Sequence, residues 1–322
     1  MKYTSLAVGL VALHLMAVAA QAAGVVKVTP LGSHDGEFCA FDRAIIFEDP
    51  DGTRILYDAG RTVRGPDDPR LGKIDVVLLS HAHNDHLGEA IQPAANAGTC
   101  AVPDISVNVT PKSNTVNIVV AKKAKFIVGG EMGSFFSKKV AAAGGEASQV
   151  QLLRFGATRK VGGVSFATVP AAHTNGLDPQ FLEGGYGKEL KDNALTAYLG
   201  PPNGYILTFS NGLVVYLSGD TGIIADQKTI VHDYYRPKLA VMNIGDVFTT
   251  GPKEAAAAID TLIKPREVIA SHANEAATKD GRIIAGTKAE MFAKATKATV
   301  RIPLSGKTLA FDAGGKCVSG CK

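Results

Sequence analysis

Short apolar runs, many of them rich in Val and Ile, recur along the chain and are separated by Gly, Pro, Asn and Asp. Such runs are typical of buried β-strands, because a helix needs a longer stretch with a period of 3.6 residues. The pattern predicts strands at 25–30, 43–48, 53–58, 74–80, 115–121, 125–129, 149–154, 163–169, 194–199, 204–209, 212–218, 238–244, 266–271 and 307–311.

Helices are predicted at about 86–97, 131–144, 253–263 and 287–296. Pro252 and Pro265 flank the third of these, at positions where proline favours a helix boundary. The Gly pairs at 129–130 and 184–185 indicate turns. The strands are too many for a simple doubly wound sheet. We therefore expect an α/β fold in which two sheets pack face to face, with helices outside.

The densest group of metal-binding side chains follows the apolar run at 74–79, where residues 80–86 read Ser-His-Ala-His-Asn-Asp-His. This mixture of imidazole and carboxylate suits zinc, iron or manganese. In an extended chain His81 and His83 lie on the same side and can share one ion. Asp85 and His86 lie past the strand end and suit a second ion. The alternative is a solvated loop or an adventitious His-rich tract. A buried strand leading into the cluster argues against it, because α/β proteins place their chemistry at strand ends.

The pattern His-x-His-x-Asp-His resembles the defining motif of the metallo-β-lactamase-fold hydrolases. Four further residues, each just past a predicted strand, match the family in order: Asp58, His173, Asp220 and His272. Each alone is a weak signal, since a lone Asp or His at a strand end is more often structural. The resemblance is supported because all four residues occur in the order and with the spacing of the family pattern.

The resemblance implies an αββα sandwich with two divalent metal ions, zinc before manganese or iron. By this family pattern the metal ligands are His81, His83, Asp85, His86, His173, Asp220 and His272. Asp220 would bridge the two ions, and Asp58 would hold the imidazoles from behind. Two such ions can share a water and lower its pKa, so the implied chemistry is hydrolysis by a hydroxide held between them. Asp85 and Asp220 would orient that hydroxide, and Asp58 would fix the imidazole tautomers.

The branch within this family is narrowed by Asp220, which stands where one class of zinc β-lactamases uses Cys. Segment 218–222 resembles the phosphodiesterase-like branches, which include ribonuclease Z, and segment 243–256 resembles the ascorbate-6-phosphate lactonases. The segment 273–275, Ala-Asn-Glu, departs from both patterns. We expect a metal-dependent hydrolase of a small ester, lactone or phosphoester. The alternatives are an iron-containing redox member of the same fold and a non-catalytic metal-binding or ligand-binding protein.

Two loops are candidates for contacts with a small-molecule substrate. His34 follows the first predicted strand, and the insertion 174–192 separates His173 from the next strand. For both, an ordinary surface loop is an equally good interpretation. The net charge of +4 is too small for a nucleic-acid partner, which requires a clustered basic face. The sequence does not indicate an oligomeric state.

The first 22 residues have the form of a secretory signal peptide. A short start with Lys2 is followed by an apolar stretch from 6 to 19 and by Ala-Gln-Ala at 20–22. A membrane anchor is the alternative, but the stretch is short for a span, and small residues follow it. We expect a hydrolase domain at 23–322, in the periplasm or secreted, with no stable membrane insertion after processing.

In an oxidising compartment the four cysteines can form two disulfides. Four cysteines allow three ways of pairing. The short spacing of Cys317 and Cys321 favours a bridge between them, with Cys39 and Cys100 as the other pair. A thiolate zinc site is the alternative, which the lack of a Cys-x-x-Cys pair disfavours.

Cleavage after about residue 22 is the first testable prediction. Mass spectrometry of the periplasmic fraction of an expressing bacterium should show a mature chain that lacks the apolar stretch. A chain that still begins at Met1 would indicate retention or an anchor.

Overall fold

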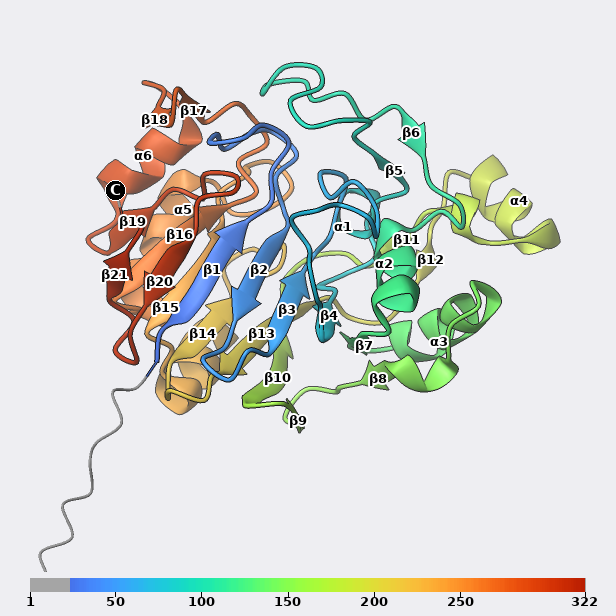
Figure 1. Ribbon diagram of the computed structural model, residues 1–322, viewed down its shortest axis with the longest axis horizontal. Coiled ribbons are helices and arrows are strands. Elements are labelled where there is room, and N and C mark those ends of the chain that lie inside the picture. Colours follow the sequence, from blue (N-terminus) through green and yellow to red (C-terminus); the bar gives the residue numbers. More distant parts are fainter. Residues whose placement is uncertain (1–23, 322) are drawn as a thin grey trace, which may run out of the picture.

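The computed structural model describes residues 24–321, so the expected signal peptide at 1–22 lies outside the described residues. Two large β-sheets pack face to face, and helices cover the outer side of each (Figure 1). This four-layer arrangement is the expected αββα sandwich.

The first sheet has the order β21-β20-β1-β2-β3-β4-β7-β8. Its strands are β1 (Val26–Pro30), β2 (Ile45–Glu48), β3 (Arg54–Tyr57), β4 (Val76–Leu78), β7 (Lys125–Val128), β8 (Val150–Leu152), β20 (Leu309–Phe311) and β21 (Cys317–Ser319). The strands β3, β4, β7 and β8 are parallel to one another, so their carboxyl ends lie at one edge.

The second sheet has the order β19-β16-β15-β14-β13-β10-β9. Its strands are β9 (Thr158–Val161), β10 (Val164–Pro170), β13 (Asn203–Thr208), β14 (Val214–Leu217), β15 (Leu239–Asn243), β16 (Glu267–Ser271) and β19 (Thr299–Arg301). Three two-stranded sheets complete the set: β5 (Ala90–Ile91) with β6 (Val107–Asn108), β11 (Gly176–Leu177) with β12 (Ala197–Tyr198), and β17 (Thr278–Lys279) with β18 (Arg282–Ile283).

The helices fall into two outer groups and several short connections. The α-helices are α1 (Asn84–Leu87), α2 (Asn114–Lys122), α3 (Met132–Ala142), α4 (Gly184–Asp192), α5 (Pro252–Ala257) and α6 (Lys288–Ala295). Two 3₁₀ turns, η1 (Ala147–Gln149) and η2 (Pro179–Phe181), and two π-helical segments, η3 (Gln227–Tyr235) and η4 (Ala258–Ile263), are also present. Helices α2 and α3 pack on the first sheet, and α5, α6, η3 and η4 pack on the second.

Alternation along the strands explains why both faces of each sheet are apolar. In β2, Ile45 and Phe47 point into the core between the sheets, whereas Ile46 points out toward α2 and α3. In β13, Leu207 faces the central core and Ile206 faces the outer helices. Successive side chains of a strand lie on opposite faces, so a strand buried on both sides is an uninterrupted apolar run. These are the runs that predicted the strands.

The expected strand at 115–121 is wrong, because these residues form α2. The side chain of Ser113 accepts a hydrogen bond from the amide of Val116 and caps the helix. Val116 and Val119, three residues apart, are both buried against the first sheet. Packing of this face outweighs the preference of Val and Ile for strands.

Three further expectations need correction. The helix expected at 86–97 is limited to α1, because Gly88 takes a left-handed conformation with φ of 73° and ends it. The Gly pair at 184–185 begins α4 and is not an isolated turn; the first turn of a helix tolerates glycine, and Leu190 further along is buried. Of the strand expected at 194–199, only β12 is formed.

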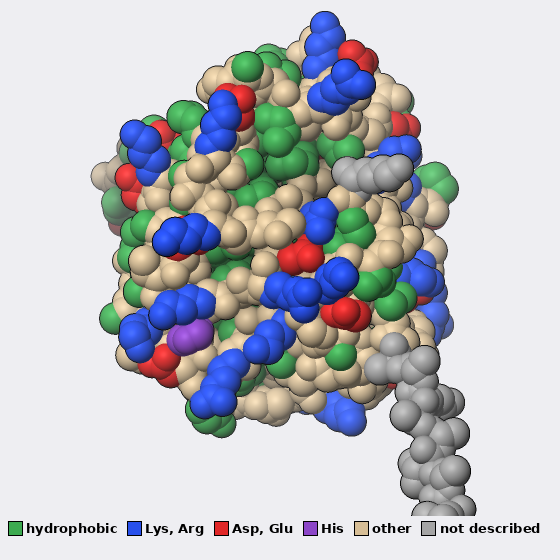
Figure 2. All heavy atoms as spheres, turned by 90° about the vertical axis from the view of Figure 1, so that its left-hand side faces the viewer, with side chains coloured by type: hydrophobic (Ala, Val, Ile, Leu, Met, Phe, Trp, Pro, Cys, Tyr) green, Lys and Arg blue, Asp and Glu red, His purple; other side chains and the backbone are tan. Residues whose placement is uncertain are grey.

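The cysteines form the pairs Cys39–Cys100 and Cys317–Cys321, as the sequence favoured. Among the described residues, no helix is both long and apolar enough to cross a membrane. On the face shown in Figure 2, Lys and Arg side chains outnumber Asp and Glu, but acidic and apolar groups lie between them. The absence of a nucleic-acid partner stays a prediction.

Tyr205 of β13 connects the two sheets next to the end of β4. Its buried hydroxyl lies 2.7 Å from the carbonyl oxygen of Leu79 and 3.1 Å from that of Ile127, and donates to them. Both carbonyls belong to the first sheet or its strand ends. The second sheet thereby holds the segment from which the 80–86 motif departs.

We expect Tyr205→Phe to lower the free energy of unfolding by about 1–2 kcal/mol, because two buried carbonyls lose a donor. Urea unfolding measures this difference. Tyr216→Phe is the matched control, since the buried Tyr216 hydroxyl approaches Gln227 without completing a hydrogen bond. A loss as large for the control would show that the Tyr205 hydrogen bonds contribute little.

Candidate metal centre

The candidate residues of the sequence analysis follow strands whose carboxyl ends meet at one edge of the sandwich. Asp58 follows β3, and the 80–86 motif follows β4. In the second sheet, segments just after β10, β14 and β16 carry His173, Asp220 and His272. The structure brings all of them together, which no single segment of the sequence could show.

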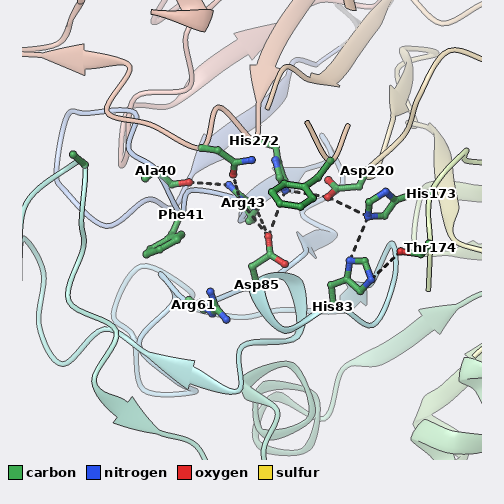
Figure 3. Close-up of a pocket in the computed structure, with 13 residues that line it drawn as sticks. Ala40, Phe41, Arg43, Arg61, His83, Asp85, His173, Thr174, Asp220 and His272 are labelled. Carbon is green, nitrogen blue, oxygen red and sulfur yellow. Dashed lines mark hydrogen bonds and ion pairs between the residues drawn. The ribbon is translucent and has the colours of Figure 1, made fainter. Parts of the chain in front are cut away.

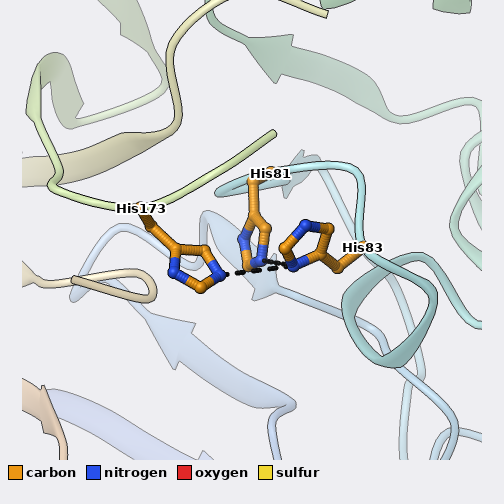
Figure 4. Close-up of side chains that lie close together, drawn as sticks. All are labelled: His81, His83 and His173. Carbon is orange, nitrogen blue, oxygen red and sulfur yellow. Dashed lines mark hydrogen bonds between the residues drawn. The ribbon is translucent and has the colours of Figure 1, made fainter. Parts of the chain in front are cut away.

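The first group consists of three imidazoles. His81 Nε2 lies 3.0 Å from His83 Nδ1, and His173 Nε2 lies 3.3 Å from the same atom. Figure 4 shows the three rings converging on one point. Each offers one ring nitrogen, and these nitrogens lie within 4.8 Å of one another, close enough to hold one metal ion. Three imidazoles around an open position are typical of catalytic zinc.

The second group consists of Asp85, His86 and His272, whose ligand atoms also lie within 4.8 Å of one another. Asp85 Oδ2 lies 3.6 Å from His86 Nε2 and 3.4 Å from His272 Nε2. Asp220 lies between the two groups: its oxygens are 3.0 Å from His272 Nε2 and 3.4 Å from His86 Nε2. The Asp220 carboxylate also approaches the first group, at 3.9 Å from His81 Nε2 and 3.8 Å from His173 Nε2.

Asp58 does not reach the centre of the site and instead holds the motif from behind. Its carboxylate accepts hydrogen bonds from the Ser80 amide at 2.8 Å and the Ser80 hydroxyl at 2.7 Å. It also lies 2.8 Å from His86 Nδ1. Ser80 Oγ is in turn 2.9 Å from His81 Nδ1. With Nδ1 of both imidazoles engaged in this way, their Nε2 atoms face the site.

Burial gives the first group neutral imidazoles. Burial, assisted by neighbouring histidines, holds the pKa of His81 well below its usual range and lowers the pKa of His83 to about 4. The pKa of His173 is lowered as well, again mainly by burial. A neutral imidazole is the form that binds a metal ion. These side chains are therefore ready to act as ligands at neutral pH.

The second group strongly attracts positive charge. Burial opposes charge on His86, but the carboxylates of Asp220, Asp85 and Asp58 raise its pKa well above the usual range. Burial likewise opposes ionisation of Asp85 and Asp220, but His86 and His272 hold the pKa of both carboxyls well below normal. The carboxylates of Asp58, Asp85 and Asp220 all lie near His86, and such a set of mostly buried carboxylates needs compensating cations.

Local backbone geometry at the strand ends is unusual. Asp58 and His272 have positive φ of 43° and 54°, a conformation that costs energy for residues other than Gly and is concentrated at functional sites. Gly245 has no such φ but needs its lack of a side chain, because a Cβ there would lie 2.7 Å from His272 Nδ1. The chain after β15 can therefore pass directly behind the His272 ring.

The donor set fits a pair of metal ions. Among the described residues, the buried Nε2 atoms of His86 and His272 have no hydrogen-bond partner, although each lies between carboxylates. A buried polar atom without a partner is costly, and a metal ion at this point would satisfy it. The mixture of imidazole and carboxylate matches zinc, manganese and iron.

Arg43 was not anticipated from the sequence, where it is one Arg among many. Its guanidinium is almost fully buried and is 3.2 Å from Asp85 Oδ2. It also donates to Asn274 Oδ1 at 2.6 Å and to the carbonyl oxygens of Ala40 and Asp42. Arg43 thus fixes one carboxylate of the second group and joins it to the loop after β16. Because Asp85 and Asn274, its side-chain partners, are distant in sequence, no local pattern could have identified this role.

A cavity of about 590 Å³ opens above these side chains. Its floor contains residues of both groups, which point toward one another in Figure 3, with Phe41 and Arg61 to one side. Its walls are formed by Ala40, Phe41, Arg43, Arg61, Ala101, Thr174, Phe248 and Asn274.

Of the two loops expected to contact substrate, only one residue lines the cavity. His34 is not among the lining residues; its ring contacts Ser33 Oγ and the Gly98 carbonyl. From the insertion 174–192 only Thr174 lines the cavity, and Phe181 is buried below it in the core of the first sheet. Substrate contact by His34 stays a prediction.

The chain matches the family model described as "Beta-lactamase superfamily domain" over residues 53–273, and it belongs to this superfamily. It is a metal-dependent hydrolase of the metallo-β-lactamase fold. Relatives named UPF0173 metal-dependent hydrolase include one from Cupriavidus metallidurans, which is 30% identical. The aligned region spans 75% of this chain and 71% of that relative. Another, from Polynucleobacter asymbioticus, is 29% identical and covers 81% of each. The family expected from the motifs is confirmed.

Solved structures agree on the fold. A metallo hydrolase from Ignicoccus hospitalis superimposes with a TM-score of 0.58 at 22% identity, covering 89% of this chain and 99% of that one. The isothiocyanate hydrolase from Delia radicum gut bacteria superimposes with a TM-score of 0.51 at 19% identity. The match covers 89% of this chain and 100% of that one.

We expect Arg43→Gln to lower the free energy of unfolding of the metal-free protein by about 1–3 kcal/mol, because it removes a buried guanidinium that pairs with the partly buried Asp85 carboxylate. Urea unfolding in the presence of a chelator measures this. Arg154→Gln is the control: its pair with Glu131 is largely exposed, so the stability should not change measurably. Equal behaviour of the two variants would contradict a supporting role for Arg43.

Proposed function

We propose that the protein is an exported hydrolase that uses two divalent metal ions, zinc before manganese or iron, to cleave a small ester, lactone or phosphoester. The observation that carries this proposal is the convergence of the two His and Asp groups, with Asp220 between them, at the floor of one cavity. Membership of a superfamily of metal-dependent hydrolases supports it.

The proposed ligands divide between the ions as the geometry groups them. His81, His83 and His173 would hold one ion, and Asp85, His86 and His272 the other. Asp220 supports a shared role, because its carboxylate approaches imidazoles of both groups. Ions held by these residues would supply Lewis acidity, which lowers the pKa of a nearby water and polarises a carbonyl or phosphoryl oxygen.

The residues of the chain would supply orientation. Asp85 and Asp220 accept hydrogen bonds from the attacking water and so fix its direction. Asp58 holds the His86 and His81 imidazoles through Nδ1, directly and through Ser80. The water oxygen bonds to the carbonyl carbon or the phosphorus, the bond to the leaving oxygen breaks, and the proton lost by the water is transferred to that oxygen. No co-reactant other than water is needed.

Export is part of the proposal. The apolar stretch and the Ala-Gln-Ala at 20–22 support it, as do the two disulfides, which persist in oxidising compartments.

We expect two metal ions per mature chain after loading with zinc and desalting, measured by plasma mass spectrometry. His272→Ala or Asp85→Ala should reduce the content toward one ion, and Asp220→Ala should weaken both sites. His232→Ala is the matched control, because His232 lies on η3 and hydrogen-bonds to the Ile263 carbonyl instead of the centre. Metal-dependent hydrolysis of at least one ester, lactone or phosphodiester should be lost in His81→Ala.

A loaded wild-type protein with one ion or none would disprove the dinuclear site. Iron in protein purified without added metal, together with oxidation and no hydrolysis, would instead favour the redox alternative. Hydrolysis of β-lactams alone would overturn the substrate class while leaving the metal site intact.

A further inference from the structure

We propose that the cavity selects substrates with an uncharged, apolar body, such as an aryl or alkyl ester or lactone, held between Phe41 and Phe248. This inference rests on the proposed hydrolytic function and specifies its substrate class. It separates such substrates from sugar phosphates and other molecules with a charged tail.

Two aromatic side chains from distant parts of the chain line the cavity. Phe41 lies in the segment between β1 and β2, and Phe248 lies between β15 and α5. The Phe248 side chain is 72% exposed. Exposed apolar groups beside a cavity are typical of a ligand-binding site, because a ligand can remove them from water.

The cationic groups of the walls already have anionic partners. Arg43 is paired with Asp85, as described above. Arg61 donates to both carboxylate oxygens of Glu89, and its guanidinium lies 5.7 Å from the centre of the Phe41 ring. No Lys lines the cavity among the described residues. A phosphate or carboxylate tail is normally bound by Arg or Lys whose charge is not already paired. Both guanidinium groups of these walls are paired with carboxylates, so the walls offer little uncompensated positive charge to a charged tail.

The two aromatic walls differ in how firmly they are held. The segment with Phe41 begins at Cys39, which is bridged to Cys100, and the Ala40 amide donates to the Cys100 carbonyl oxygen at 3.0 Å. On the opposite side Asp246 and Val247 have φ of 62° and 59°. This conformation is strained for a β-branched residue such as Val. The disulfide thus fixes the Phe41 side, and the strained backbone before Phe248 sets the position of that ring at the cavity.

Binding of matched metal chelators tests the selectivity without depending on turnover. The zinc-loaded protein is titrated calorimetrically with acetohydroxamate, phenylacetohydroxamate and succinohydroxamate, which share one metal-binding group and differ in the body. We expect phenylacetohydroxamate to bind at least about tenfold tighter than acetohydroxamate, because the ring is removed from water. Succinohydroxamate, with its carboxylate tail, should gain nothing over acetohydroxamate.

Variants assign the preference to the two side chains. Phe248→Ala and Phe41→Ala should each reduce the ratio of phenylacetohydroxamate to acetohydroxamate affinity several-fold, without changing acetohydroxamate binding. Phe248→Ala removes an exposed ring and should fold normally. Tyr234→Ala removes a ring of similar exposure on η3, outside the cavity, and should leave the ratio unchanged.

Equal affinities for the three chelators, a preference for the charged tail, or a ratio that both Phe variants leave intact would each overturn the inference. These outcomes are distinct from failure of the proposed function. A protein that binds phenylacetohydroxamate selectively but hydrolyses no ester or lactone would retain the selectivity and lose the hydrolytic assignment.

Discussion

The buried carboxylate of Asp58 is the contact on which the metal centre depends. It accepts both donors of Ser80 and lies against His86 Nδ1, so one residue after β3 determines the path of the chain after β4. Without it, the Ser80 amide and hydroxyl would be buried without acceptors, and two imidazoles would be free to rotate. A loss of about 10- to 100-fold in metal affinity or activity is typical when such supporting contacts are removed.

The centre places side chains with opposite charge preferences close together. Buried imidazoles avoid charge, while buried carboxylates require it, and the structure separates them into a mainly neutral group and an acidic group. The carboxylates of Asp220, Asp85 and Asp58 raise the pKa of His86 and so favour a proton on it in the metal-free chain. An ion proposed for the second group would have to displace that proton, so its binding should depend more strongly on pH than binding at the first group.

The sequence predicted the parts of this protein that are governed by local patterns. Strand runs, the 80–86 motif and the strand-end positions of Asp58, His173, Asp220 and His272 depend on period and spacing, and the structure brings these residues together. Segment 115–121 was predicted wrongly because its β-branched residues prefer strands, whereas packing on the first sheet favours a helix. The Ser113 cap was a local helix signal, but it is weaker than the strand preference of the β-branched residues that follow it.

The cavity walls were beyond prediction for a related reason. Arg43, Phe41 and Phe248 acquire their roles only from neighbours that are distant in the chain. The insertion 174–192 shows that residues close in sequence to a ligand need not lie at the cavity. Its position next to His173 in sequence suggested a cover for the site, yet most of it packs away from the cavity.

The Cys39–Cys100 bridge closes a loop with a sequence separation of 61 residues, and this loop contains Arg43, Asp58 and the whole 80–86 motif. By the chain-entropy argument, closing a loop of this length restricts the unfolded chain by about 4 kcal/mol. Every proposed ligand of the first sheet therefore lies inside one covalent ring. Metal occupancy and thiol oxidation are then thermodynamically linked: a chain with the bridge reduced must use part of its metal-binding energy to order that ring. Oxidation of these two cysteines would thus also lower the metal concentration at which the proposed sites stay occupied.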